Sequence, residues 1–160
     1  MALSSHAEIL IDSLIMHEEL IAHLYELFAE QFPFEDSFWL SLREEELHHA
    51  AMLRDLKQKM IIDVVSFNLK DERSNIIAVR MAVNYVRSII TFVVRQHVNL
   101  AVASSMAVDV EGSLVEKGVF RLFTSEDQPT QLTIDALAHS FGTHIARIEQ
   151  FRAMQHAQEA

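Results

Sequence analysis

The chain has 160 residues, a length that suits one domain, and half of them are apolar, which is enough to bury a core. Three glycines and two prolines supply too few turns for an all-β sandwich or barrel, so long helices are expected. A formal charge of −10 argues against a nucleic-acid partner, and a sequence without cysteine excludes disulfides, Cys-ligated zinc and iron–sulfur clusters.

The N-terminal region and the apolar stretches bear on localisation. The first 16 residues contain Asp12 and neither lysine nor arginine, a composition unlike that of a secretory signal. The most apolar stretch, 88–94, lies between Arg87 and Arg95 and is far too short to span a bilayer. We therefore expect a cytoplasmic protein without a membrane partner.

Both prolines lie where a helical hairpin is expected to turn. Pro33 separates two strongly periodic segments, and Pro129 follows a polar stretch of helix-capping residue types. The β-branched and charged residues of 61–75 are typical of an irregular connection. The predicted helices, in chain order, span 5–31, 35–60, 76–96, a segment that ends near Phe123, and 130 to the C-terminus. The sequence thus predicts one all-α domain over 1–160: a four-helix bundle of two antiparallel hairpins with a long crossover that contains an extra helix.

Helix 5–31 carries two adjacent acids, and the helical spacing of apolar residues indicates which of them faces the core. Steps of three and four residues along the helix from Glu18 meet only apolar or aromatic residues between 11 and 28, namely Ile11, Leu14, Ile21, Tyr25 and Phe28. The face of Glu19 includes Asp12 and Glu26 and is polar. Because a carboxylate inside a core is costly unless it is paired or bound to a metal, Glu18 requires a partner there.

Helix 35–60 contains two overlapping Glu-x-x-His motifs, of which one faces the core. Glu46 and His49 share their face with apolar residues, whereas Glu45 and His48 share theirs with polar and charged ones and are expected to be solvated. A carboxylate and an imidazole at i and i+3 lie one turn apart on the same face, so they can bind one ion together. This is the inward-facing motif of di-iron carboxylate bundles.

The depth of these residues in the bundle is an independent check. Glu18 and Glu46 lie about 15 and 13 residues from Pro33, which places both roughly 20 Å from that turn. Glu111 and His144 lie about 16 and 17 residues from a second turn near 127, at roughly 25 Å. The two hairpins therefore look like a degenerate repeat, each with a glutamate on its first helix and a histidine on its second. Glu116 is a rival to Glu111.

The chain resembles the rubrerythrin-like branch of the ferritin-like superfamily over its four main helices. The motifs that carry the resemblance are Glu18-x6-Tyr25, Glu45-Glu46-Leu47-His48-His49-Ala50 after Trp39, and Val110-Glu111-Gly112-Ser113-Leu114. The resemblance implies a ferritin-like bundle with a non-haem di-iron centre that performs redox chemistry with oxygen or peroxide. It also implies a set of metal ligands, namely Glu18, Glu46, His49, Glu111 and His144. Tyr25 is then a core residue or one that contacts a ligand.

Two positions depart from the family pattern. Phe141 stands three residues before His144, where the second Glu-x-x-His motif requires a carboxylate, and Gly118 replaces the tyrosine expected seven residues after Glu111. The site is then a single-metal site, a di-metal site completed by water, or a decayed one. The remaining histidines are expected to be surface or structural residues, namely His6, His17, His23, His48, His97, His139 and His156.

The sequence favours a non-haem iron protein with one or two irons, manganese and zinc being alternative occupants. An external electron donor is needed, since the chain has no cysteine for a rubredoxin-type iron. The alternatives are a non-enzymatic helical module whose metal site has lapsed, and iron storage in a larger assembly. The apolar segment 76–94 further predicts a homodimer or a larger homo-oligomer.

Overall fold

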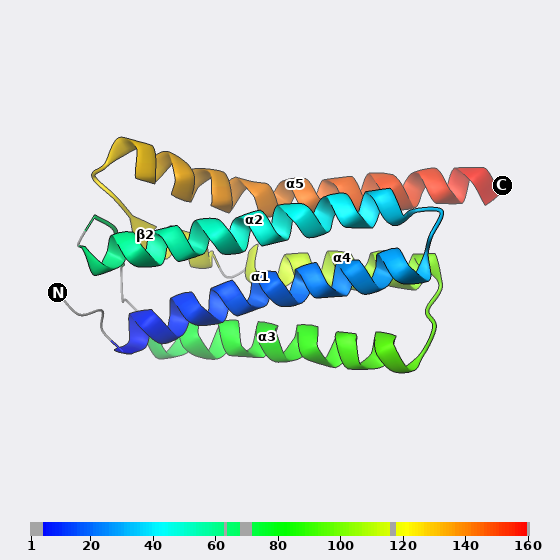
Figure 1. Ribbon diagram of the computed structural model, residues 1–160, viewed down its shortest axis with the longest axis horizontal. Coiled ribbons are helices and arrows are strands. Elements are labelled where there is room, and N and C mark those ends of the chain that lie inside the picture. Colours follow the sequence, from blue (N-terminus) through cyan, green and yellow to red (C-terminus); the bar gives the residue numbers. More distant parts are fainter. Residues whose placement is uncertain (1–4, 63, 68–71, 116–117, 160) are drawn as a thin grey trace.

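A computed structural model of the protein describes residues 5–62, 64–67, 72–115 and 118–159 (Figure 1). Its elements are, in chain order, α1 (Ser5–Gln31), α2 (Asp36–Ile61), β1 (Ser66–Phe67), α3 (Glu72–Arg95), α4 (Leu100–Val115), a 3-10 helix η1 (Val119–Leu122), β2 (Phe123–Thr124) and α5 (Gln128–Glu159). The all-α prediction is confirmed. The one strand pairing in the described ranges joins two residues of β1 to two of β2, in antiparallel register.

The five helices run side by side along the long axis of the molecule (Figure 1). The α1–α2 and α3–α4 connections lie at the end where the C-terminus is found, and the β1–β2 pair lies at the opposite end. Helices α1, α3 and α5 run in one direction and α2 and α4 in the other. Helix α3 therefore carries the chain back along the bundle from the end of α2 to the start of α4.

The third predicted bundle helix is shorter than the sequence suggests. A helix is predicted up to Phe123, but α4 ends at Val115 and the chain continues through η1 into β2. Gly118 adopts a φ of 61°, a left-handed conformation that side-chain-bearing residues rarely take, and this turns the chain into η1. Val119 and Phe120 are then buried in the core. As a result α4 has 16 residues, whereas the neighbouring α3 has 24.

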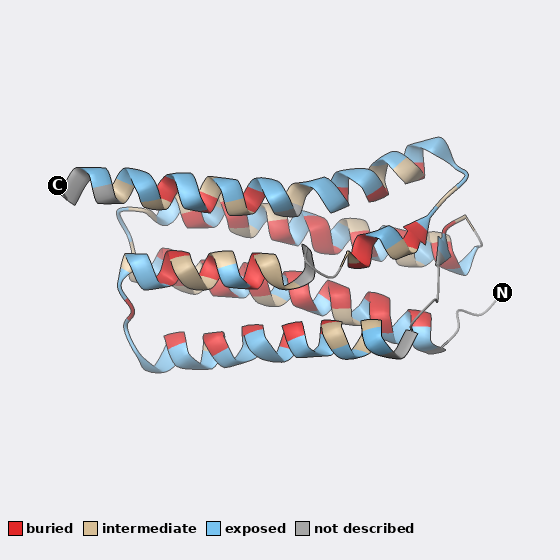
Figure 2. Cartoon of the chain, turned by 180° about the vertical axis from the view of Figure 1, so that it is seen from behind, coloured by how far each residue is buried: buried red, intermediate tan, exposed pale blue. Residues whose placement is uncertain are grey.

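The apolar core consists of two clusters placed one after the other along the bundle. One contains Leu10, Leu14 and Leu53 near the β1–β2 end, and the other contains Leu24 and Trp39 near the helix turns. Buried positions line the sides of the helices that face one another (Figure 2). Between the two clusters lies a layer of buried charged and polar residues, which forms the candidate site described below.

Helix α3 packs one face on the bundle through residues such as Val79, Val83 and Val86. Its stretch Ser74–Arg95 is the one described helix long and apolar enough to cross a membrane, and one third of its apolar window is buried in the bundle. The apolar region of this helix is longer than the 88–94 stretch considered in the sequence. A core helix of a soluble protein passes the same test, so localisation stays a prediction.

Candidate metal centre

Five side chains from four helices meet in the polar layer, and they are the five ligands that the sequence predicts. Helix α1 supplies Glu18, α2 supplies Glu46 and His49, α4 supplies Glu111, and α5 supplies His144. All five are buried, and the most exposed of them, His49, keeps only 6% of its surface accessible. Residues up to 126 positions apart in the sequence are thereby brought into one layer, as the matched depth of the two hairpins predicts.

Glu46 lies at the centre of the group, with one histidine on each side. Its Oε2 is 3.2 Å from Nδ1 of His49, and its Oε1 is 2.6 Å from Nδ1 of His144. Beyond His49, Oε2 of Glu18 lies 3.5 Å from the same Nδ1. Beyond His144, Oε1 of Glu111 lies 3.4 Å from that histidine's Nδ1. The two imidazole rings stack, with 5.2 Å between their centroids.

The polar atoms in this layer are not fully hydrogen-bonded. Of the five buried side-chain atoms without a hydrogen-bond partner among the described residues, four belong to this layer and the fifth is Nε1 of Trp39; the four are Glu18 Oε2, Glu46 Oε1, Glu111 Oε2 and His144 Nδ1. Although Glu46 Oε1 and His144 Nδ1 are only 2.6 Å apart, they do not meet in hydrogen-bonding geometry. An unsatisfied buried polar group is costly, and three carboxylate oxygens together are more so. Three carboxylate oxygens and one imidazole nitrogen that converge without hydrogen bonds fit a bound cation.

The distances within the group are also consistent with metal binding. Glu46, His49 and His144 each offer one ligand atom, and these three atoms lie within 4.8 Å of one another. The ligand set is hard oxygen plus imidazole, which suits iron, manganese or zinc. The residues present therefore fit the metal that the sequence implies, although they do not identify it.

The electrostatics of the layer favour positive charge. Burial by itself lowers the pKa of a histidine, yet hydrogen bonds and charge from Glu18 and Glu46 raise the pKa of His49 to about 9. For His144, Glu111 and Glu46 likewise outweigh burial and raise the pKa to about 11. The pKa of Glu46 rises to about 8, first because it is buried and then because Glu111 is nearby. At neutral pH His49, His144 and Glu46 therefore keep their protons, and these protons compensate for the negative charge of the buried carboxylates.

Tyr25 contacts the ligand Glu111, as the sequence allows. Its hydroxyl donates a hydrogen bond of 2.6 Å to Oε1 of Glu111, and its ring packs against Trp39 with 5.8 Å between centroids. Burial raises the pKa of Tyr25 well above 10, and the neighbouring charge of Glu111 adds to the shift, so the hydroxyl remains a donor. Tyr25 therefore orients one oxygen of Glu111.

His17 has a closer relation to the site than the sequence indicates. It is completely buried, its Nδ1 lies 3.0 Å from Oε1 of Glu18, and its Nε2 lies 3.4 Å from the hydroxyl oxygen of Ser113. Burial raises the pKa of Glu18, but hydrogen bonds from His17 and His49 outweigh it and lower that pKa to about 2. His17 does not lie on the apolar stripe of α1 that contains Glu18, so the sequence does not predict its burial. It is buried because α3 and α4 cover another face of α1.

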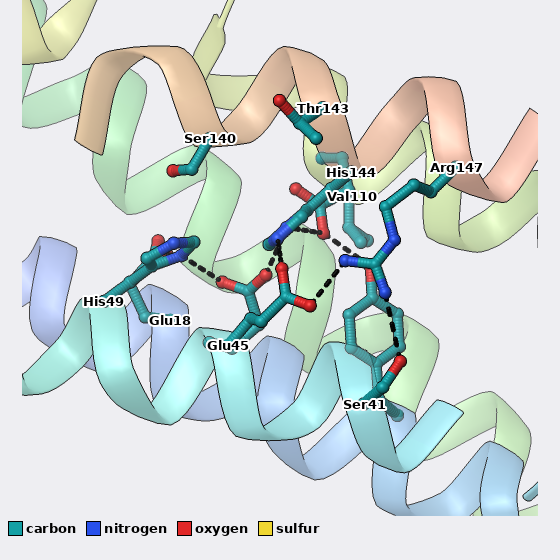
Figure 3. A network of polar contacts seen from close by, with 12 residues as sticks. Glu18, Ser41, Glu45, His49, Val110, Ser140, Thr143, His144 and Arg147 are labelled. Atoms are coloured by element: carbon teal, nitrogen blue, oxygen red, sulfur yellow. Dashed lines mark hydrogen bonds and ion pairs between the residues drawn. The ribbon is translucent and has the colours of Figure 1, made fainter. Parts of the chain in front are cut away.

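Glu45, expected to be solvated, keeps 42% of its side-chain surface accessible, but it also makes contacts that the sequence does not predict. Its Oε2 lies 2.8 Å from Nε2 of His144, and its Oε1 lies 2.5 Å from the guanidinium of Arg147, which also reaches Ser41 (Figure 3). The reason is that α5 lies over the flank of α2 that carries Ser41 and Glu45. When Glu45 accepts a hydrogen bond from Nε2 of His144, Nδ1 of the same ring is directed at the site. In metal-binding histidines, a hydrogen-bond partner of this kind fixes the tautomer of the ring.

The remaining predicted positions are accounted for as follows. His6, His23, His48, His97 and His139 are exposed, in agreement with the sequence, whereas the side chain of His156 lies outside the described part. The backbone of Phe141 belongs to α5, but its side chain lies outside the described part of the chain. Glu116 lies outside it with both backbone and side chain. The consequence of a phenylalanine three residues before His144 therefore stays a prediction.

Comparison of the chain with protein-family models, with curated proteins and with solved structures gives no match in any of the three. The resemblance to rubrerythrin-like proteins accordingly rests on the sequence motifs alone.

Proposed function

We propose that the protein is a ferritin-like, non-haem iron protein that binds one or two metal ions in the polar layer of its bundle. The observation that carries the proposal is the convergence of three unsatisfied carboxylate oxygens and one unsatisfied imidazole nitrogen between two apolar clusters. A buried arrangement of this kind is costly to maintain for packing alone, and apolar residues would fill the same space at lower cost.

The order and direction of the helices support the same proposal. The ligands come from α1, α2, α4 and α5, and α3 provides the long connection between the two hairpins (Figure 1). Ferritin-like bundles combine four such helices with one long crossover and direct carboxylates and Glu-x-x-His motifs inward. Here Glu46 and His49 form one complete motif, while His144 lacks its carboxylate partner three residues earlier.

The proposed ligands divide into two groups that share one carboxylate. Glu18 and His49 would hold one ion, Glu111 and His144 would hold another, and Glu46 would contact both. A bound iron supplies one-electron redox chemistry, for which oxygen or peroxide is the oxidant that we propose, with electrons from an external donor. Around it, Tyr25 and Glu45 hold Glu111 and His144 in place, and the two apolar clusters exclude water.

Metal analysis of protein purified without chelator tests the proposal. We expect about one or two equivalents of iron per chain after anaerobic loading, and a lower melting temperature after treatment with EDTA. Protein that binds no stoichiometric metal, and whose stability is unchanged by EDTA, would instead be a helical module with a lapsed site. A closed assembly of many subunits in size-exclusion chromatography would favour iron storage.

A further inference from the structure

A groove lies on the outer side of α3, away from the metal-ligating side chains. Its volume is about 540 Å³, which is in the range of pockets that bind small organic molecules. The described residues that line it are Ser74, Ile77, Ala78, Met81, Ala82 and Tyr85 of α3, and Ser113 of α4.

The groove exists because α4 is shorter than α3. The hydroxyl of Tyr85 lies 3.5 Å from Oδ2 of Asp109, which shows that these two residues are level in the antiparallel pair. Ser113 follows Asp109 by one helical turn, and α4 ends two residues later. By this register the end of α4 is level with Val79, so the part of α3 from Ser74 to Val79, about 8 Å long, extends past the end of α4.

The wall of the groove is apolar and exposed. Ile77 and Met81 keep 57% and 67% of their surface accessible, although the opposite face of the same helix carries the core residues Val79 and Val83. Helix α3 thus has apolar side chains on two faces, one packed on the bundle and one lining the groove. An apolar wall in a concave site contributes binding energy to an apolar ligand.

One polar group marks the end of the groove that is nearest to the metal centre. The hydroxyl of Ser113 donates a hydrogen bond of 2.7 Å to the carbonyl oxygen of Val110, so its proton is already in use. Its oxygen faces the buried His17 at 3.4 Å, and His17 in turn contacts Glu18. Because it has two lone pairs, the Ser113 oxygen can accept one more hydrogen bond from a donor in the groove.

We propose that this groove binds a small apolar molecule that carries one hydrogen-bond donor, such as a phenol or a long-chain alcohol. The apolar body lies along Ile77, Ala78 and Met81, and the donor end binds the oxygen of Ser113. Such a ligand lies two side chains, Ser113 and His17, away from Glu18. The proposal does not depend on metal binding, so it is tested on the metal-free protein.

The test uses two aromatic probes of nearly equal size, 2-naphthol and naphthalene, in fluorescence titrations of the metal-free protein. We expect saturable binding of both, with 2-naphthol on the order of fivefold tighter, as one neutral hydrogen bond provides. Ser113→Ala should remove this difference and leave naphthalene binding unchanged. Ala78→Phe should fill the groove and abolish binding, whereas Ala138→Phe, at an exposed alanine of α5, should leave binding intact.

A second pair of variants guards against misfolding of Ala78→Phe. Met81→Lys places a charge in the apolar wall at a well-exposed position and should weaken binding of both probes, whereas Met154→Lys on α5 should not. The proposal is wrong if neither probe binds saturably, or if Ser113→Ala leaves the preference for 2-naphthol in place. It is also wrong if size-exclusion chromatography shows a dimer that Met81→Lys dissociates, since the groove is then an interface between two copies of the chain.

Discussion

The two helical hairpins bring equivalent side chains to the polar layer, but they hold them in different ways. In the α1–α2 hairpin, Glu46 and His49 lie one turn apart on a single helix and contact each other. Glu18 faces them from α1, and its other oxygen contacts His17, the adjacent residue of the same helix. Most of the contacts that orient these three side chains therefore form within the hairpin itself.

The α4–α5 hairpin depends on its neighbour for the same purpose. Glu111 of α4 is held by the hydroxyl of Tyr25, which belongs to α1, and His144 of α5 is held by Glu45, which belongs to α2. Its two side chains can thus reach their positions only after the hairpins have packed together. The comparison teaches that the α1–α2 half of the site is preorganised locally, whereas the α4–α5 half is a product of tertiary packing.

The largest effect is expected from Glu46→Ala, because Glu46 contacts both His49 and His144. The variant should lose iron binding in both halves, whereas His48→Ala, at an exposed position of the same helix, should leave it nearly intact. Without metal, Glu46→Ala should be as stable as the parent or more so, since it lacks a buried carboxylate. Metal analysis and urea denaturation measure the two effects. Loss of iron binding in His48→Ala would contradict the assignment.

Anaerobic titration of the metal-free protein with Fe(II) separates the two halves. We expect two unequal steps, or a single step at one iron per chain, with the tighter ion held by Glu18, Glu46 and His49. The weaker ion has Glu111 and His144 and lacks the carboxylate that Phe141 replaces.

Phe141→Glu supplies that carboxylate and should strengthen the weaker step. Two equal, tight steps in the unmodified protein would mean that another group completes the second half.

Glu45→Ala tests whether the α4–α5 half relies on α2. Removing the partner of His144 Nε2 should weaken the second step by roughly 10- to 100-fold and leave the first step unchanged. Glu44→Ala is the matched control, since Glu44 is the exposed neighbour on the same helix. Equal affinities for Glu45→Ala and the parent would show that the contact between Glu45 and His144 does not orient the ring.

The smallest effect concerns the start of α5. Asp127 accepts hydrogen bonds from the backbone and the hydroxyl of Thr130, whereas α2 has no side-chain hydrogen bond at its N-cap. These bonds lower the pKa of Asp127 below the ordinary aspartate value of 3.8, so their stabilisation is present above that pH and is lost as the pH falls through the lowered pKa. Asp127→Ala should lower the melting temperature by a few degrees at pH 7 and by less at pH 3.

The contrast between the hairpins also explains how far the sequence predicts the site. Glu18, Glu46 and His49 follow from helical spacing alone, because the apolar stripes on α1 and α2 face each other within one hairpin. Glu111 and His144 do not follow from one hairpin's helical spacing; they follow from their matched depth and from the family resemblance. The burial of His17 and the contacts of Glu45 do not follow, since they depend on which helix covers a second flank of α1 or α2.

The same limit applies to the fold. The boundaries of α1 and α2 agree with the sequence to within one residue, because Pro33 and the helical spacing define them locally. The early end of α4 at Val115 could not be predicted, because it depends on the left-handed conformation of Gly118 and on the pairing of β2 with β1. That pairing joins segments 57 residues apart in the sequence, Ser66–Phe67 and Phe123–Thr124.

The polar layer between the two apolar clusters has a consequence for cooperativity. In the metal-free protein the layer separates the two clusters, which share Leu20 as a partly buried neighbour, so the two ends are expected to open as separate units in native-state amide exchange. Leu53→Ala, at the β1–β2 end, should then speed exchange at that end and leave the backbone around Leu24 protected. A metal ion bound by side chains of α1, α2, α4 and α5 would link the two units. In the metal-bound protein the same substitution should therefore speed exchange at both ends.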